Sequence, residues 1–407
     1  MKKVWDKWTR IALVKRILVG LILGAILGIA VPQATGIAIL GDVFVSALKA
    51  IAPLLVFFLV ISSLCNAGKS HGGVIKTVII LYMFSTVLAA VIAVFASMAF
   101  PVKMTLANAA TDTSAPQGIV EVLNNLLLNV VANPVSSLVN ANYVGILMWA
   151  VLLGLAFRAA DKMTKKVLAD VADGISMVVT WIINLAPFGI FGLVFNTVST
   201  NGLDIFTTYG KLLLLLVGCM LFIYFVTNPL LVYWCIRQNP YPLIFHCLKR
   251  SALTAFFTRS SAANIPVNMK VCEEMGLDRD TYSVTIPLGA TINMDGAAIT
   301  ITVMTMATAF TLGIHVDIPT AIILSLLAAL SACGASGVAG GSLLLIPMAC
   351  SLFGISDDIS MQVVAVGFII GVVQDSVETA LNSSSDLLLS ASAEFRQWRL
   401  EGKEIKF

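Results

Sequence analysis

Long runs of apolar residues, interrupted by few charges, follow one another along the chain. A helix needs about 20 mostly apolar residues to cross a bilayer, and eight runs come near or exceed this length. They are Ile17–Val31, Val43–Cys65, Val74–Phe100, Tyr143–Phe157, Val167–Thr197, Leu212–Ile236, Tyr282–Phe310 and Gln362–Glu394. The pattern predicts an all-α polytopic membrane protein with eight transmembrane helices.

Two further apolar segments have polar or glycine-rich centres and do not fit as crossings. Basic residues flank Ser251–Met269 on both sides, and its middle reads Thr-Arg-Ser-Ser from Thr258. Thr320–Phe353 has four glycines within the eight residues from Gly334, which a regular helix tolerates poorly. Irregular backbone at membrane depth survives where it is buried in protein or lines a cavity. We therefore predict two re-entrant hairpins, one from each face.

The second half of the chain contains this arrangement twice, because each hairpin precedes a helix with acidic residues. Ser260 and Asp295 are 35 residues apart, and Gly337 and Asp375 are 38 apart. Broken segments at corresponding positions of two inverted repeats indicate the binding site of a secondary transporter.

Composition agrees with a membrane protein. Of the 407 residues, 58% are hydrophobic and 12% charged, and the mean hydropathy is +0.96. Soluble domains carry about 25% charged residues, so a soluble globular protein, a disordered protein and a coiled coil are excluded. The net charge of +3 and the lack of a basic stripe argue against a nucleic-acid partner.

The basic residues orient the predicted spans. If the N-terminus lies inside, 21 of the 25 lysines and arginines fall on that side, while Lys49, Lys103 and Lys211 fall outside and Arg259 lies at membrane depth. Cytoplasmic loops carry such an excess of positive charge. We expect eight crossings with both termini in the cytoplasm.

The last predicted helix carries Asp375, Glu378, Asn382 and Asp386. Spacings of three, four and four residues place them on one helical face. Each acid costs about 2.5–3.5 kcal/mol at the bilayer centre, or roughly 8–10 kcal/mol for three. Binding a cation or a substrate ammonium group offsets this cost, whereas the alternative, a solvated face, requires the segment to lie outside the membrane.

In the seventh predicted span, Asn293 and Asp295 would point about 200° apart on a regular helix. They can serve one cavity if the helix unwinds, which Pro287, Gly289 and Gly296 favour. Unwinding frees carbonyl oxygens, which are ligands for hard cations. The alternative is a kinked packing helix with one buried aspartate.

The hairpin tips offer donors for an anion. Ser260 and Ser261 stand where a returning helix begins, and free N–H groups at such a helix start bind carboxylates; Gly337–Gly341 offers similar donors. A substrate with an anionic group at the tips and a cationic group at Asp375 would be an amino acid, although composition alone does not distinguish this from a dicarboxylate. An intramembrane hydrolase would need a base near its nucleophile, and Ser260 has no histidine nearby, so we expect no enzyme.

Four motifs in this order resemble those of the dicarboxylate/amino acid:cation symporters, the glutamate-transporter family. They are Thr258-Arg259-Ser260-Ser261, Asn293-Met294-Asp295-Gly296, the glycine-rich hairpin and Asp375–Asn382–Asp386. The resemblance covers essentially the whole chain. It implies a homotrimer in membrane lipid, with a scaffold (1–66 and 104–200, of which the second part begins with an external loop), a mobile transport unit (67–103 and 201–395) and a cytoplasmic tail (396–407).

The resemblance also implies site residues. Asp375 would bind the substrate amino group, Asn382 would lie near the substrate backbone, and the hairpin tips would bind its carboxylate. The implied substrate contacts are Ser260, Ser261, Gly337, Val338, Asp375, Glu378, Thr379 and Asn382. Three Na⁺ sites are implied: Asp386 with carbonyls of Gly289, Asn293 and Asn382; Asp295 and Asn293 with Tyr82, Ser85 and Thr86; and carbonyls of Thr291, Ala332, Cys333 and Ala335. Na⁺ is the coupling ion, and no cofactor is implied.

One departure from the family bears on the substrate. Members that carry acidic amino acids have an arginine where this chain has Glu378, and an acid there repels an acidic substrate. The chain is similar to the bacterial branch that imports serine and threonine with Na⁺ by an elevator-type mechanism, in the cytoplasmic (inner) membrane. A sodium- or proton-coupled symporter of another neutral amino acid or of a dicarboxylate remains an alternative. Arg259 would pair with Glu378 or with a hairpin carbonyl.

Overall fold

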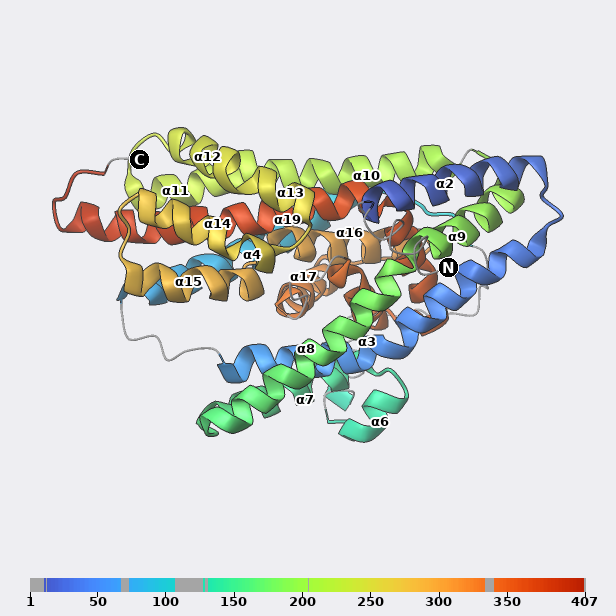
Figure 1. Ribbon diagram of the computed structural model, residues 1–407, viewed down its shortest axis with the longest axis horizontal. Helices are drawn as coiled ribbons and strands as arrows, with labels where there is room; N and C mark the ends of the chain where they lie inside the picture. The colour runs from blue at the N-terminus through green and yellow to red at the C-terminus, as the bar shows by residue number, and fades with distance from the viewer. Residues whose placement is uncertain are drawn as a thin grey trace.

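The computed structural model describes residues 11, 13–66, 73–106, 127–128, 131–203, 205–333 and 340–405. Within these ranges every regular element is a helix (Figure 1). Six helical segments of the described chain are long and apolar enough to cross a membrane. The chain is therefore a polytopic membrane protein by helix length and composition, and the count of eight crossings stays a prediction.

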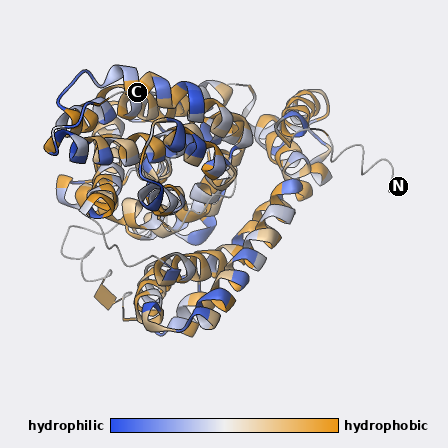
Figure 2. Ribbon diagram, turned by 60° about the vertical axis from the view of Figure 1, so that its left-hand side comes forward, coloured by the Kyte–Doolittle hydropathy of each residue, from blue (hydrophilic) through white to orange (hydrophobic). Residues whose placement is uncertain are grey.

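The helices pack as two groups, seen as two bodies in Figure 2. In the first group α2 packs on α9, and α3 packs on α7, α8 and α9. Its members are α2 (Leu13–Ala30), α3 (Ile39–Asn66), α6 (Pro134–Val139), α7 (Tyr143–Ala156), α8 (Lys162–Asn184) and α9 (Ala186–Asn201), with 3-10 turns at Thr35–Ala38 and Phe157–Ala159.

Three glycines bring α2 against the backbone of α9. A Cβ added at Gly20 would lie 2.2 Å from the carbonyl oxygen of Pro187, and Gly24 and Gly28 face α9 in the same way one and two turns later. Small residues four apart are the usual means by which membrane helices approach closely.

The second group surrounds α19, an unbroken helix of 44 residues that is buried over most of its length. The helices packed on α19 include α4, the segment α10–α11 and, from the two predicted hairpins, α13, α14 and α18. The group comprises α4 (Gly73–Ala99), α10 (Ile205–Phe222), α11 (Asn228–Ile236), α12 (Tyr241–Cys247), α13 (Leu253–Thr258), α14 (Ser261–Glu274), α15 (Arg279–Ile292), α16 (Asp295–Thr311), α17 (Ile318–Ala332), α18 (Ile346–Ser351) and α19 (Asp357–Leu400). Two π-helical turns, Ile223–Thr227 and Leu248–Ala252, and a 3-10 turn, Gly341–Leu345, complete it.

One predicted span is wrong. We predicted a single helix over Val167–Thr197, but α8 ends at Asn184 and α9 begins at Ala186. Pro187 explains the break, because its ring removes a backbone donor and clashes with the preceding turn. The predicted unwinding of the seventh span is confirmed: α15 ends at Ile292, Asn293 and Met294 are non-helical, and α16 begins at Asp295.

The first predicted hairpin is a helix–turn–helix whose turn is made by Arg259. This residue caps α13 with a left-handed backbone (φ 52°), and Ser260 then starts α14, which packs against α13. In the second, α17 ends at Ala332 and the described chain resumes at Gly340, also left-handed (φ 73°). Whether either segment re-enters from one membrane face stays a prediction.

Candidate functional site

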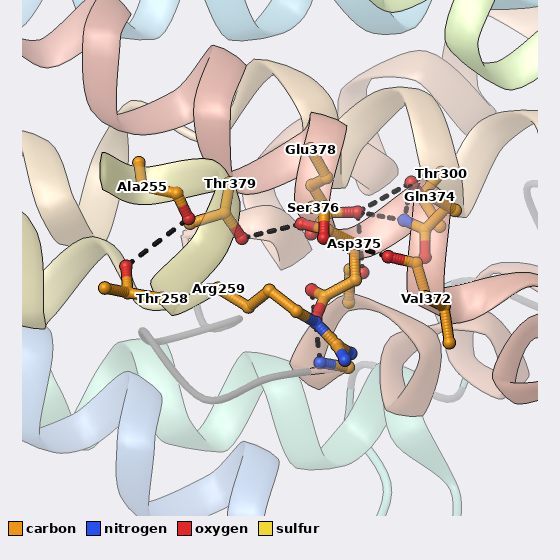
Figure 3. A network of polar contacts seen from close by, with 12 residues as sticks. Ala255, Thr258, Arg259, Thr300, Val372, Gln374, Asp375, Ser376, Glu378 and Thr379 are labelled. Carbon is orange, nitrogen blue, oxygen red and sulfur yellow. Dashed lines mark hydrogen bonds and ion pairs between the residues drawn. The ribbon is translucent and has the colours of Figure 1, made fainter. Parts of the chain in front are cut away.

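The predicted polar face of α19 is buried inside the second group of helices. Figure 3 shows two of its residues, Asp375 and Glu378, with their polar contacts. Asp375, Glu378, Asn382 and Asp386 are at most 5% exposed. The alternative of a solvated face is therefore wrong. Each of these side chains instead hydrogen-bonds to residues outside α19.

Asp375 joins the two hairpins. One of its oxygens, Oδ2, accepts from both Nε and Nη2 of Arg259 at 2.6 Å, and Oδ1 accepts from the backbone N–H of Gly340 at 3.3 Å. Both members of the ion pair are nearly inaccessible to solvent. Both pairings expected for Arg259, with Glu378 or with a hairpin carbonyl, are thus wrong. The left-handed turn aims the guanidinium at Asp375, one turn before Glu378.

Glu378 accepts three hydrogen bonds on one oxygen. Its Oε2 accepts from Thr300 Oγ1 at 2.7 Å, from Ser342 Oγ at 2.9 Å and from Gln374 Nε2 at 2.5 Å. The donors come from α16, from the segment after Gly340 and from α19 itself. The Glu378 carboxylate therefore connects three elements. The side-chain oxygen of Gln374 is buried and has no partner among the described residues.

Asp386 and Asn382 face the break between α15 and α16. Asp386 Oδ1 accepts from Asn293 Nδ2 at 2.9 Å, and Asn382 Oδ1 accepts from the N–H of Gly296 at 2.7 Å. Gly289 permits this approach, because a Cβ there would lie 2.8 Å from Asp386 Oδ1. Asn293 Oδ1 is buried without a partner among the described residues, so an oxygen ligand is left over beside a carboxylate.

The second implied sodium set is also brought together. Asp295 accepts from Ser85 Oγ at 2.8 Å and from Thr86 Oγ1 at 3.1 Å, both from α4. Tyr82, one turn before Thr86, donates to the backbone oxygen of Asp386 at 2.8 Å. Both carboxylates are buried among oxygen-bearing groups, which suits a hard cation.

The third implied set lies partly outside the described residues, since Ala335 is not among them. Cys333 donates from Sγ to the carbonyl oxygen of Ile292 at 3.7 Å, which puts the end of α17, including Ala332, beside the end of α15. Thr291 belongs to that same last turn of α15. The helix ends that carry the described members of this set are thus in contact, and a sodium site there stays a prediction.

The first hairpin tip has the geometry of a helix start. Ser260 is the N-cap of α14, its Oγ accepts from the N–H of Ala263 at 3.2 Å, and Ser261 is buried beside it. The predicted contacts Gly337 and Val338 lie outside the described residues. Thr379 turns its hydroxyl to its own helix, donating to the carbonyl oxygen of Asp375 at 2.8 Å.

One network escaped the sequence analysis. Asn264 donates to Ser251 Oγ at 2.9 Å and to Ser383 Oγ at 2.8 Å, and Asn268 donates to the Ser383 carbonyl at 2.8 Å. These buried bonds fasten the first hairpin to α19. The sequence pattern of these short polar residues does not indicate that they pair. Gln374, which bonds to Glu378, was predictable, because it precedes Glu378 by one turn of the same helix.

Buried carboxylates, an interrupted helix and two turns converging on α19 define an ion-coupled membrane carrier. A family model described as the sodium:dicarboxylate symporter family matches residues 13–394, and the chain belongs to this family. It is 57% identical over 406 residues to a protein of Bifidobacterium adolescentis named serine/threonine transporter SstT, covering 100% of this chain and 94% of that protein. Two Streptococcus thermophilus proteins of the same name are 55% and 56% identical, over 98% of this chain and 100% of theirs. These relatives are transporters, in agreement with the expectation of no enzyme.

Proposed function

We propose that the protein is a secondary active symporter that imports serine and threonine together with Na⁺. Glu378 is the observation that carries this proposal. It is a buried acid that accepts hydrogen bonds from Thr300, Ser342 and Gln374, three residues after Asp375 on the same helix. A substrate bound at Asp375 would therefore have a carboxyl group and hydroxyl groups near its side chain. A small neutral side chain with a hydroxyl is compatible with this setting, whereas a second carboxylate is repelled.

The backbone groups of the amino acid fit the remaining positions. The substrate carboxylate would lie at the start of α14, where Ser260 and Ser261 are, because helix N-termini favour anions. The ammonium group would approach Asp375, whose charge Arg259 balances in this structure. Gly337 and Val338 would close the site from the second hairpin, and Asn382 and Thr379 would line it along α19.

Sodium ions would occupy the oxygen-rich places beside the broken helix. Asp386, Asn293 Oδ1 and the carbonyls of Gly289 and Asn382 form one candidate site. A second consists of Asp295 and Asn293 with Tyr82, Ser85 and Thr86, and a third of carbonyls at Thr291, Ala332, Cys333 and Ala335. The support is that the carboxylates of Asp295 and Asp386 contact no basic side chain among the described residues. A bound cation supplies the missing positive charge.

Movement of the whole site would follow the division into two packed groups. The first group corresponds to a scaffold (1–66 and 104–200) and the second to a transport unit (67–103 and 201–395), which carries the substrate across in an elevator-type motion. Three copies would associate through their scaffolds in the lipid of a bacterial cytoplasmic (inner) membrane, as a multi-pass protein with eight spans, two re-entrant hairpins and both termini in the cytoplasm.

Uptake of labelled serine into liposomes tests the proposal. With Na⁺ outside and K⁺ inside, we expect labelled serine to be taken up. Unlabelled threonine should compete with this uptake, and replacing Na⁺ by choline should abolish it. Excess aspartate should leave uptake unchanged. Uptake that persists in choline, or that aspartate competes as well as threonine does, would overturn the proposal and favour the proton-coupled or dicarboxylate alternative.

A further inference from the structure

A groove runs between α4 and α10 in the second helix group, and none of its lining residues belongs to the candidate site. Its volume is about 840 Å³, within the range of roughly 300–1,000 Å³ that small ligands fill. The residues that line it include Phe95, Phe100, Lys211, Gly218 and Phe222. Phe95 of α4, Phe100 directly after that helix and Phe222 of α10 are exposed, so the groove opens to the surroundings of the protein.

The groove is apolar except at one end. Of the described residues that line it, Lys211 alone is charged, and the others are apolar side chains and glycine. Lys211 lies in the second turn of α10, and Phe100 and Pro101, which line the same groove, directly follow the end of α4. The cation therefore stands at the membrane-boundary end of both helices, and the apolar wall extends inward from it.

The length of the groove matches one leaflet. Lys211 and Phe222 are eleven residues apart on one helix, which at 1.5 Å per residue spans about 16 Å. The hydrocarbon core of a bilayer is about 30 Å thick, so each leaflet contributes roughly 15 Å. Lys211 at the boundary therefore suits a negatively charged lipid head group, and the apolar groove, about as long as one leaflet is deep, suits an acyl chain.

We propose that the groove between α4 and α10 binds one anionic phospholipid of the surrounding bilayer. Its phosphate pairs with the Lys211 ammonium group, and one acyl chain lies along Gly218 toward Phe222. The proposal requires only that the chain sits in a bilayer, so it stands or falls independently of the serine transport proposed above.

Gly218 provides a way to fill the groove without disturbing its walls. A Cβ added there meets nothing within 4 Å, and the same holds for Gly210 on the same helix, which does not line the groove. Gly218→Leu therefore blocks the groove, and Gly210→Leu is its matched control, because both changes raise helix propensity equally. Lys211→Gln removes the cation, Lys211→Arg keeps it, and Lys103→Gln removes an exposed lysine close to the end of α4.

Photolabelling of the full-length protein in phosphatidylcholine vesicles tests the proposal. The probe is phosphatidylglycerol with a diazirine in one acyl chain, compared with phosphatidylcholine carrying the same chain. We expect the phosphatidylglycerol probe to label 92–102 and 211–222 about fivefold more than the neutral probe, the factor that one lysine contributes to binding anionic lipid. Lys211→Gln should remove this preference and Lys211→Arg should retain it. Gly218→Leu should reduce labelling by both probes, and Gly210→Leu and Lys103→Gln should behave as the parent.

Three outcomes would overturn the proposal. Equal labelling by the two probes in the parent protein would mean ordinary contact with bulk lipid. An absence of label from both segments would mean that the groove is covered by another part of this chain or by a second copy. A loss of preference in Lys103→Gln as large as that in Lys211→Gln would mean a general surface attraction instead of a site.

Discussion

The ion pair between Arg259 and Asp375 should behave as a strongly coupled unit. Arg259 is 9% exposed and Asp375 3%, and Asp375 Oδ2 accepts from two guanidinium nitrogens at 2.6 Å. Removing one partner of such a pair leaves a buried charge without compensation and costs about 3–5 kcal/mol. We expect Arg259→Gln and Asp375→Asn each to lower the free energy of unfolding by about this amount.

The double variant separates this pairing from other effects. When both charges are absent, no charge is left unpaired, so the double variant should be no less stable than either single variant, with a coupling of about 3 kcal/mol or more. The free energy of unfolding can be measured by SDS titration in mixed micelles without substrate. Losses that simply add, or single variants that each cost less than about 1 kcal/mol, would refute the buried pairing.

Four further outcomes follow from particular contacts. Glu378→Arg should admit aspartate and lose serine in the liposome uptake assay, because the charge facing the substrate side chain is reversed; unchanged serine uptake would show that Glu378 does not face that side chain. Asp386→Asn should raise the Na⁺ concentration needed for half-maximal uptake, since a charged ligand becomes neutral, and an unaltered sodium dependence would remove Asp386 from the ligands. Gly296→Ala should impair uptake strongly, because its Cβ would lie 2.9 Å from the Cα of Glu378, whereas Gly371→Ala, with nothing within 4 Å, should transport normally; similar uptake by both would contradict the tight contact between α16 and α19. Hydrogen bonds from Thr320 lower the pKa of Asp317, the N-cap of α17, so its stabilising effect is present at neutral pH and is lost as the pH falls through that lowered pKa. Asp317→Ala should accordingly reduce stability at pH 7, by about 1 kcal/mol. Below the lowered pKa of Asp317, where the carboxyl group is protonated, the substitution should make little difference. An equal loss of stability at pH 7 and at that acidic pH would contradict the role of Asp317 as the helix cap.

The main helices and the polar face of α19 could be predicted because they depend on local spacing. Residues three and four apart share a face in any α-helix, so Asp375, Glu378, Asn382 and Asp386 are aligned whatever surrounds them. The break at Asn293 was predictable for a similar reason, since the residues that favour it stand in the same segment. Pro187 offered equally local information about the break before α9, and the long apolar run masked it.

Pairings across the fold could not be predicted in the same way. The partner of Arg259 depends on a left-handed turn, which sets the direction of the side chain and leaves no mark in the hydrophobic pattern. Thr300 and Ser342 meet Glu378 from elements separated in sequence by 78 and 36 residues. Such contacts arise when whole helices pack, and residue type alone does not specify them.

The unbroken course of α19 determines which parts of the site can change conformation when an ion or a solute binds. At 1.5 Å per residue, Asp375 and Asp386 stay about 16 Å apart in any motion that leaves the helix intact. The spacing of these carboxylates along the helix therefore does not change when a ligand binds. Any change of shape when an ion or a solute binds therefore falls to the non-helical residues Asn293 and Met294 and to the turns at Arg259 and Gly340.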